Sequence, residues 1–147
     1  MIEKTLNEWL EKLSGTFGQQ WQLDDNQCRL TTESGEPYIN MEWLPIQQLF
    51  LIAAPLDTFS SEDSEAQKRL IQHLALNSHP DVIGKGWIAL GDNDEGVYLI
   101  QALEPSALVY EKFEAKWREF SQLVEDVKLY LADNDISSPP LGLGIRI

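Results

Sequence analysis

The sequence predicts a single α+β domain in which helices pack on a twisted, largely antiparallel sheet, in the order α-β-β-β-α-β-β-α. Apolar residues at helical spacing open and close the chain, and runs of strand length lie between them, separated by turn residues. A length of 147 residues suits one domain. We therefore expect a folded domain over residues 1–135 and a C-terminal tail over residues 136–147.

The first half of the chain opens with an amphipathic helix from Ile2, because its apolar residues recur at steps of three and four. Gly15 or Gly18 can end this helix. A short strand is expected around the turn 24–26. Residues 38–44 then alternate between apolar and polar side chains, which predicts a half-buried strand.

The middle of the chain adds a buried strand and a second helix. Pro45 interrupts the alternating strand, and the continuous apolar run 49–54 is typical of a strand covered on both faces. Ser60 and Ser61 precede acidic residues, as expected at the start of a helix, and Pro80 is expected to close that helix. Its predicted buried stripe consists of Leu70, Ile71 and Leu74.

The last three elements are two strands and the longest helix. Residues 87–90 and 97–103 have strand character, and the turn-forming segment 91–96 joins them as a hairpin. The final helix is expected to start at 104–106. Its apolar stripe consists of Val109, Phe113, Trp117, Phe120, Val124, Val127 and Leu131.

The charge of the chain restricts its partners. Lys and Arg total 11 against 24 Asp and Glu, which gives a formal net charge of −13. Such a surface repels phosphate backbones and anionic lipid, so we expect no nucleic-acid or membrane binding and a neutral or basic partner. Cys28 has no second cysteine with which to form an intrachain disulfide, and no segment has signal-peptide or membrane-span character. These features predict a cytoplasmic protein.

No residue pattern predicts catalysis, a metal or a cofactor. His73 and His79 lie six residues apart, not at the four-residue spacing that places two imidazoles on one helical face, so both are expected at the surface or at a helix cap. Cys28 has no nucleophile motif around it and is expected to be a structural thiol. The acidic segment 92–96 lacks a carboxylate at the twelfth position of a calcium loop and is expected to be a solvated turn.

Tryptophans are spread over five different segments, which leaves two interpretations open. They either share one core or line grooves and a subunit interface, where tryptophan gives a large contact area at a low entropy cost. This content favours a binding module over an enzyme. The five residues are Trp9, Trp21, Trp43, Trp87 and Trp117.

From about Leu6 to Leu131 the chain resembles the class I type III secretion chaperones, the family that includes the chaperone of the translocated intimin receptor. The likeness consists of the opening helix, the three-strand block, the helix ending at 70–77, the strand 86–90 and the turn 92–96 before 97–99. The final helix, with Phe113, Trp117 and Phe120, matches in place and length.

This resemblance implies a homodimer without enzymatic activity that binds the N-terminal region of a secreted effector and keeps it export-competent. Two alternatives stay open: a chaperone-like regulator that exchanges between a secreted client and an anti-activator, and a related stress-linked domain outside secretion. The tail 141–147 looks like the ending of family members that also bind a regulatory anti-activator. The implied dimer interface consists of Leu70, Leu74, Trp87 and Ile88.

Client binding is predicted on the first helix and the strand 38–44, because both carry a periodic apolar face and the Pro45 break fits a strand near a sheet edge. The predicted client-binding residues are Trp9, Leu13, Ile39, Met41 and Trp43. If these residues are core instead, the opposite face of the same strand or the tail 141–147 becomes the better hypothesis.

Overall fold

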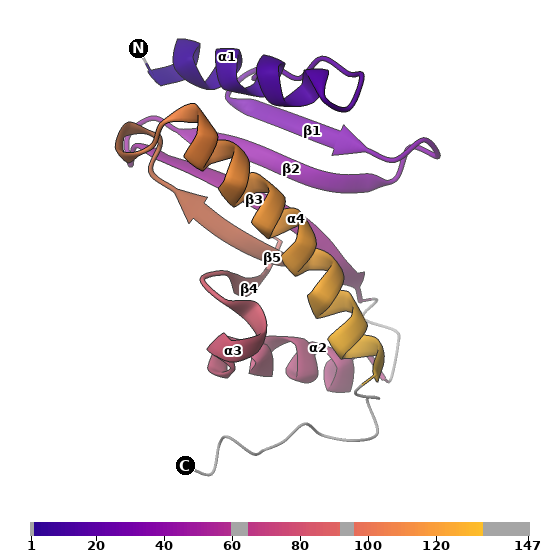
Figure 1. The fold of residues 1–147 in the computed structure, drawn as a ribbon. Coiled ribbons are helices and arrows are strands. Elements are labelled where there is room, and N and C mark those ends of the chain that lie inside the picture. The colour runs from indigo at the N-terminus through magenta and orange to yellow at the C-terminus, as the bar shows by residue number, and fades with distance from the viewer. Residues whose placement is uncertain (1, 60–64, 92–95, 134–147) are drawn as a thin grey trace. The chain divides into compact units, whose positions relative to one another are not determined.

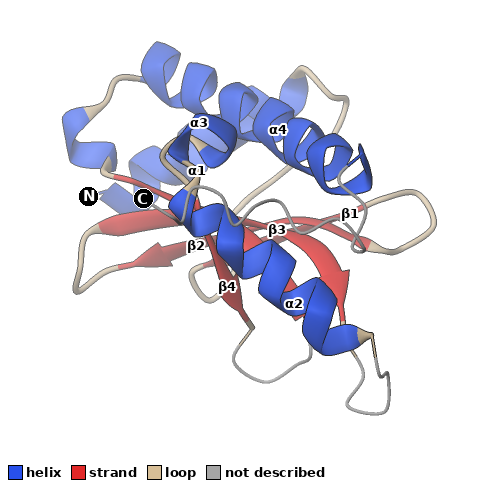
Figure 2. Ribbon diagram, turned by 90° about the horizontal axis from the view of Figure 1, so that it is seen from below, coloured by secondary structure: helices blue, strands red, loops and turns tan. Residues whose placement is uncertain are grey.

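A computed structural model describes residues 2–59, 65–91 and 96–133 and confirms the predicted α+β fold. Figure 2 shows that β1, β2 and β3 follow one another without an intervening helix. The strands form an antiparallel sheet in the order β1-β2-β3-β5-β4. The elements are α1 (Ile2–Gly15), β1 (Gln27–Thr31), β2 (Pro37–Leu44), β3 (Leu49–Thr58), α2 (Ala66–Ala75), the 3₁₀ turn η1 (Leu76–Ser78), α3 (Pro80–Ile83), β4 (Trp87–Leu90), β5 (Gly96–Leu103), the 3₁₀ turn η2 (Pro105–Ala107) and α4 (Tyr110–Asp133).

The chain divides into two compact units. Unit 1 consists of Met1–Ala53 and Gln101–Phe120, and unit 2 consists of Ala54–Ile100 and Ser121–Ile147. The strands β3 and β5 and the helix α4 contribute residues to both units. The predicted boundary between the domain and its tail, at residues 135 and 136, lies outside the described residues.

Unit 1 contains the predicted turn before β1, at residues 24–26. Asp25 and Asn26 both have positive φ, at 53° and 63°, as a two-residue turn that matches the twist of its flanking strands requires. The turn is closed by mutual backbone hydrogen bonds between Asp24 and Gln27, of 2.7 and 3.0 Å. β1 and β2 then form the hairpin seen in Figure 1, in which Cys28 lies opposite Met41.

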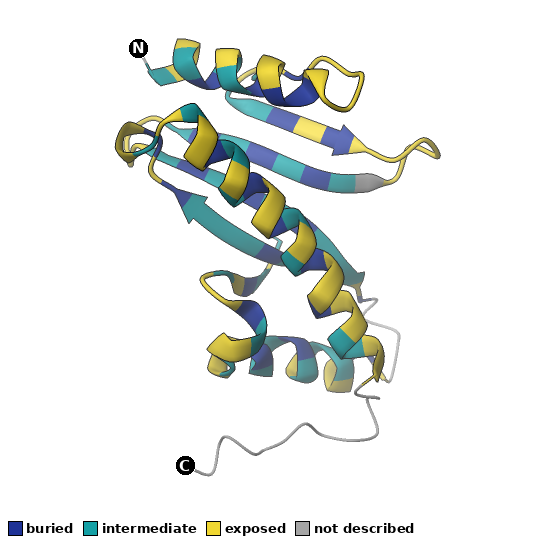
Figure 3. Cartoon of the chain, in the orientation of Figure 1, coloured by how far each residue is buried: buried dark blue, intermediate teal, exposed yellow. Residues whose placement is uncertain are grey.

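The core of unit 1 joins α1, the first half of α4 and one face of its strands. Buried and partly exposed residues alternate along β2, as Figure 3 shows. The α1 residues Leu6, Leu10 and Leu13 are fully buried. The ring of Phe113 lies 5.0 Å from that of Trp9 and 5.6 Å from that of Phe50, so the helices and strands meet in an aromatic cluster.

The position of β2 differs from the prediction. β2 is paired with β1 on one side and with β3 on the other, so it is not an edge strand. Pro45 ends the strand at the turn to β3, where Gln48 adopts a positive φ of 58°, and does not mark an edge. The terminal strands of the sheet are β1 and β4.

In unit 2 the side chain of Asn77 forms hydrogen bonds with the backbone of the terminal strand β4. The Asn77 side chain accepts a hydrogen bond from the Ile88 backbone N–H at 2.7 Å and donates one to the Ile88 carbonyl at 3.0 Å. Ile88 lies in the middle of β4, and the residues on either side of it are paired with β5. Asn77 therefore takes the place that a neighbouring strand would take, a device that discourages edge-to-edge pairing.

Several local predictions for unit 2 are wrong. β3 continues through Pro55 to Thr58, and Pro80 begins α3 instead of closing α2, because proline is well tolerated at the first position of a helix. α2 starts at Ala66, and the predicted caps Ser60 and Ser61 lie outside the described residues.

The buried face of α2 is also rotated from the predicted stripe. It contains Ala66 and His73, whereas Leu70 and Leu74 are half-buried and Ile71 is 67% exposed. The larger aliphatic side chains of this helix therefore lie mostly on a face that the described chain does not fully cover.

The final helix follows its predicted stripe closely. The predicted start at 104–106 is wrong, because the helix begins at Tyr110, after the 3₁₀ turn η2, so Val109 lies outside the helix and is exposed. Leu131 is half-buried near its end. The remaining stripe residues are buried: Phe113, Trp117, Phe120, Val124 and Val127. No helix among the described residues is long and apolar enough to cross a membrane.

Candidate functional site

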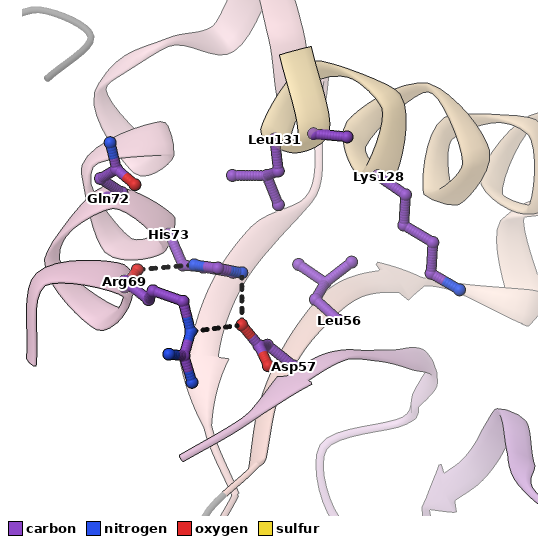
Figure 4. Close-up of a pocket in the computed structure, with 8 residues that line it drawn as sticks. Leu56, Asp57, Arg69, Gln72, His73, Lys128 and Leu131 are labelled. Atoms are coloured by element: carbon purple, nitrogen blue, oxygen red, sulfur yellow. Dashed lines mark hydrogen bonds and ion pairs between the residues drawn. The ribbon is translucent and has the colours of Figure 1, made fainter. Parts of the chain in front are cut away.

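The candidate site is an open pocket of about 440 Å³ in unit 2. It is lined by the end of β3, one side of α2 and the last turns of α4 (Figure 4). β3 contributes Leu56 and Asp57 because the strand extends past Pro55. Arg69, Gln72 and His73 share one face of α2 because they are three and four residues apart.

Asp57 is the centre of the polar end of the pocket. Its Oδ2 lies 3.3 Å from Nε of Arg69 and 3.6 Å from Nε2 of His73, and its Oδ1 accepts the Thr58 backbone N–H at 2.8 Å. The side chains of Asp57 and Arg69 are 29% and 30% exposed. Both carboxylate oxygens are therefore occupied inside the protein.

His73 is held in a fixed orientation, and the prediction that it lies at the surface is wrong. Its Nδ1 is 2.6 Å from the Arg69 carbonyl oxygen, and its side chain is 8% exposed. Phe59 packs edge-on against the imidazole at 5.6 Å, and the Arg69 guanidinium lies over the same phenyl ring at 5.0 Å. His79, by contrast, is half-buried at the N-cap of α3 without a side-chain capping bond.

The opposite end of the pocket is apolar and bears one lysine. We call Asp57, Arg69 and His73 the Asp57 cluster. Figure 4 shows Leu56 and Leu131 between this cluster and the side chain of Lys128. None of the eight lining residues carries a hydroxyl or a thiol. Within the described ranges there is also no group of three acidic, histidine or cysteine side chains placed to hold a metal.

The predicted dimer residues all lie in unit 2, on α2 and β4. Leu70 and Leu74 are half-buried, and Trp87 is 39% exposed, whereas Ile88 is buried. Ile71 and Leu90 add exposed apolar surface on the same two elements, which contact each other. Leu90 is three residues from Trp87 along β4, so its side chain lies on the opposite face of the strand. We call the remaining set the α2–β4 surface: Leu70, Ile71, Leu74 and Trp87.

The predicted client-binding residues all lie in unit 1, and four of them are buried there. Leu13 and Ile39 are fully buried, and Met41 is 1% exposed. Trp43 is buried as well, and Trp9 is half-buried against Phe113. These positions place the residues in the core, so their role in client contact stays a prediction that mutation must test.

The tryptophans divide between the two interpretations offered by the sequence. Trp21, Trp43 and Trp117 are buried in unit 1, and the rings of Trp21 and Trp117 lie 5.3 Å apart. Trp87 is the exposed member and lies on the α2–β4 surface of unit 2. Most of the tryptophan content therefore serves packing, and one ring is available to a partner.

Cys28 lies in β1 and is buried, as expected for a structural thiol. Burial raises the pKa of this thiol because it disfavours the charged thiolate, and a backbone hydrogen bond from Gln22 lowers it by a smaller amount. The neutral thiol is the less reactive form.

Sequence reasoning missed most of the pocket. Asp57, Arg69 and Lys128 come from three separate elements and form no contiguous motif. The one available signal was the helical spacing of Arg69 and His73, which places a cation and an imidazole on one face. Only the path of β3 beyond Pro55 brings Asp57 to that face.

No family model matches the sequence, and no curated protein matches it in sequence. Solved structures do share the fold. The chain is similar to a chain of the ExsC–ExsE complex, with a TM-score of 0.64 and 17% identity over 86% of this chain and 92% of that one. It is also similar to a chain of the HopA1–SchA chaperone–effector complex, with a TM-score of 0.56 and 15% identity over 84% and 96%.

A third structure has the same fold under a different description. YbjN, a proposed transcription regulator from E. coli, matches with a TM-score of 0.58 and 13% identity over 89% of this chain and 92% of that one. The fold is therefore shared with type III secretion chaperones and with YbjN. At these identities the likeness concerns the fold alone.

Proposed function

We propose that this protein is a cytoplasmic, non-enzymatic chaperone that binds the N-terminal region of a type III secreted effector and keeps it export-competent. The observation that carries the proposal is the α2–β4 surface, an uncovered apolar surface on a fold that a chaperone–effector complex also contains. The pocket of unit 2 agrees with a binding role, because it is open and none of the eight residues that line it carries a hydroxyl or a thiol.

The α2–β4 surface is proposed as the homodimer interface. Trp87 and Ile71 provide exposed apolar area, and aromatic residues are enriched in such interfaces. Because Asn77 occupies the backbone of Ile88, the two copies would meet through side chains and not by joining their sheets at that residue.

Light scattering at micromolar concentration tests the dimer. Wild type is expected at twice the mass of one chain, and Trp87→Glu is expected as a monomer, because an unpaired charge in a desolvated contact costs several kcal/mol. Val109→Glu is the matched control, since Val109 is exposed in unit 1, and it should remain dimeric. A wild-type mass near one chain would reject the dimer.

The client is proposed to bind as an extended segment that combines strand addition with apolar contacts. In unit 1 the terminal strand β1, and not the predicted β2, offers an edge for such addition. The half-buried opposite face of β2, with Tyr38, Asn40 and Glu42, is the alternative that the sequence left open.

Affinity capture from the native cell, followed by mass spectrometry, tests the chaperone function. We expect one prominent partner that is exported, whose N-terminal region alone retains binding, and whose export falls when the chaperone gene is deleted. A partner that stays in the cell, or that binds through its C-terminal region only, would contradict the proposal.

The second candidate is a regulator or stress-linked protein without a secreted client. The likeness to YbjN favours it, because that match covers 89% of this chain. The same capture experiment separates the candidates: a partner that is a regulator and is never exported would favour this one.

A further inference from the structure

We infer that the pocket of unit 2 binds a short segment of a partner protein in which an aliphatic side chain lies next to a carboxylate. The aliphatic group would pack on Leu56 and Leu131, and the carboxylate would pair with Lys128. This inference goes beyond the proposed function, because it applies whether or not the partner is secreted.

The charges that line the pocket favour an anion. Arg69 and Lys128 are cationic, and among the described residues that line the pocket Asp57 is the only acidic one. The Asp57 carboxylate is already paired with Arg69 and accepts the Thr58 N–H, and the His73 ring lies 3.6 Å from it, so little of it remains accessible to an incoming cation. Lys128 makes no ion pair within 4.0 Å in the described part of the chain, including with Glu125 one turn earlier.

The apolar part of the pocket lies where an aliphatic side chain would reach it. Leu56 and Leu131 stand between the Asp57 cluster and Lys128 in Figure 4, and the stem of Lys128 extends the same apolar wall. A lysine ammonium at the rim of such a wall can pair with a carboxylate while the neighbouring side chain loses its water. The local charge thus differs from the acidic character of the whole chain.

The open shape of the pocket favours a peptide over a small free acid. Small ligands are usually buried over most of their surface in enclosed cavities. Here Lys128 and Ala132 are exposed, and Asp57 and Arg69 are about 30% exposed, so only one side of a ligand would be covered. A longer chain that contacts the protein on both sides of the pocket can bind under these conditions.

Chemical-shift titration of the full-length, ¹⁵N-labelled protein tests the inference. The probe is the acetylated and amidated peptide Ser-Gly-Leu-Glu-Gly-Ser, with versions in which Glu is replaced by Gln or Leu by Ser. We expect shifts at the amides of Leu56 and Ala132, and affinities that fall about fivefold for the Gln version and further for the Ser version.

Lys128→Gln should lower the affinity for the Glu peptide about fivefold and remove the difference in affinity between the Glu and Gln peptides. Lys128 is exposed, so this variant is expected to fold. Lys112→Gln, an exposed lysine on the same helix but in unit 1, is the matched control and should bind as wild type.

Three results would overturn the inference. One is no shift at the pocket at millimolar peptide, or equal affinities for the Glu and Gln peptides. The second is equal affinity for 4-methylpentanoate, which would assign the pocket to small acids. The third is displacement of the probe by a synthetic peptide of residues 134–147, which would assign the pocket to the chain's own C-terminal residues.

Discussion

Unit 1 and unit 2 use their apolar residues in different ways. Most of the largest fully buried side chains, such as Trp43, Phe50 and Phe113, belong to unit 1. In unit 2 the exposed apolar residues Ile71, Trp87 and Leu90 lie on α2 and β4, and a histidine occupies the buried face of the helix. Unit 1 therefore supplies most of the buried packing, and unit 2 adds a partly uncovered apolar surface to the open β1 edge of unit 1.

The difference explains why the same kind of sequence signal has two outcomes. The periodic apolar residues of α1, β2 and α4 predict buried faces, and unit 1 buries them. The periodic apolar residues of α2 predict a buried stripe as well, but the described chain leaves that stripe partly uncovered. Periodicity identifies the apolar face of a helix, and it does not say whether the covering element is in the same chain.

The largest effect is expected from Met41→Ala in unit 1. Met41 is 1% exposed, and truncation of a buried methionine costs about 2–5 kcal/mol of unfolding free energy because it leaves a cavity. Urea denaturation followed by fluorescence measures this loss. Leu129→Ala in unit 2 is the comparison, because Leu129 is 64% exposed and lies outside the α2–β4 surface, and it should change the free energy of unfolding by less than about 0.5 kcal/mol.

Met41→Ala also tests whether Met41, one of the predicted client-binding residues, contacts the client. If Met41→Ala weakens client binding tenfold while its stability stays within about 0.5 kcal/mol of wild type, the residue contacts the client and the core interpretation is wrong. Parallel loss of stability and binding would place Met41 in the core.

A smaller effect is expected from two asparagines that substitute for backbone partners. Asn77→Ala in unit 2 removes two hydrogen bonds to Ile88, and Asn7→Ala in unit 1 removes one, to the Leu23 N–H at 2.7 Å. At about 1 kcal/mol per bond, thermal or urea unfolding should show a larger loss for Asn77→Ala.

The two asparagine variants should differ in self-association as well. Asn77→Ala exposes the edge of β4, so oligomers beyond the wild-type state should appear at high concentration in light scattering. Asn7→Ala opens no strand of unit 2 and should not produce them. Equal behaviour of the two variants would mean that Asn77 does not protect the edge.

The fold could be predicted from the sequence because its strands and helices have clear periods. The alternation in 38–44 specifies β2 within a residue. The spacing from Phe113 to Val127 specifies the buried face of α4, although the helix begins at Tyr110 and not at the predicted 104–106. Sheet position could not be predicted, because Pro45 fits both an edge strand and the end of a central one. The pocket could not be predicted, because Asp57 reaches Arg69 and His73 only through tertiary structure.

The smallest effect concerns Cys28, whose burial in unit 1 raises the pKa of its thiol above the ordinary value of 9.0. As the pH rises through this value, the unfolded chain loses the thiol proton before the folded chain does. The stability that this group contributes is therefore fully present below about pH 9 and is lost as the pH rises toward the folded pKa.

Urea unfolding at pH 7.5 and pH 10 should accordingly show a greater loss of stability in wild type than in Cys28→Ala, because the variant lacks the thiol and keeps the other titrating groups. Labelling by a thiol reagent at pH 8 provides an independent measurement, since a buried neutral thiol reacts only when unit 1 opens. Met41→Ala should then speed labelling, and Leu129→Ala should not. Immediate labelling of the folded wild type would contradict the burial of Cys28 and, with it, the view that unit 1 supplies most of the buried packing.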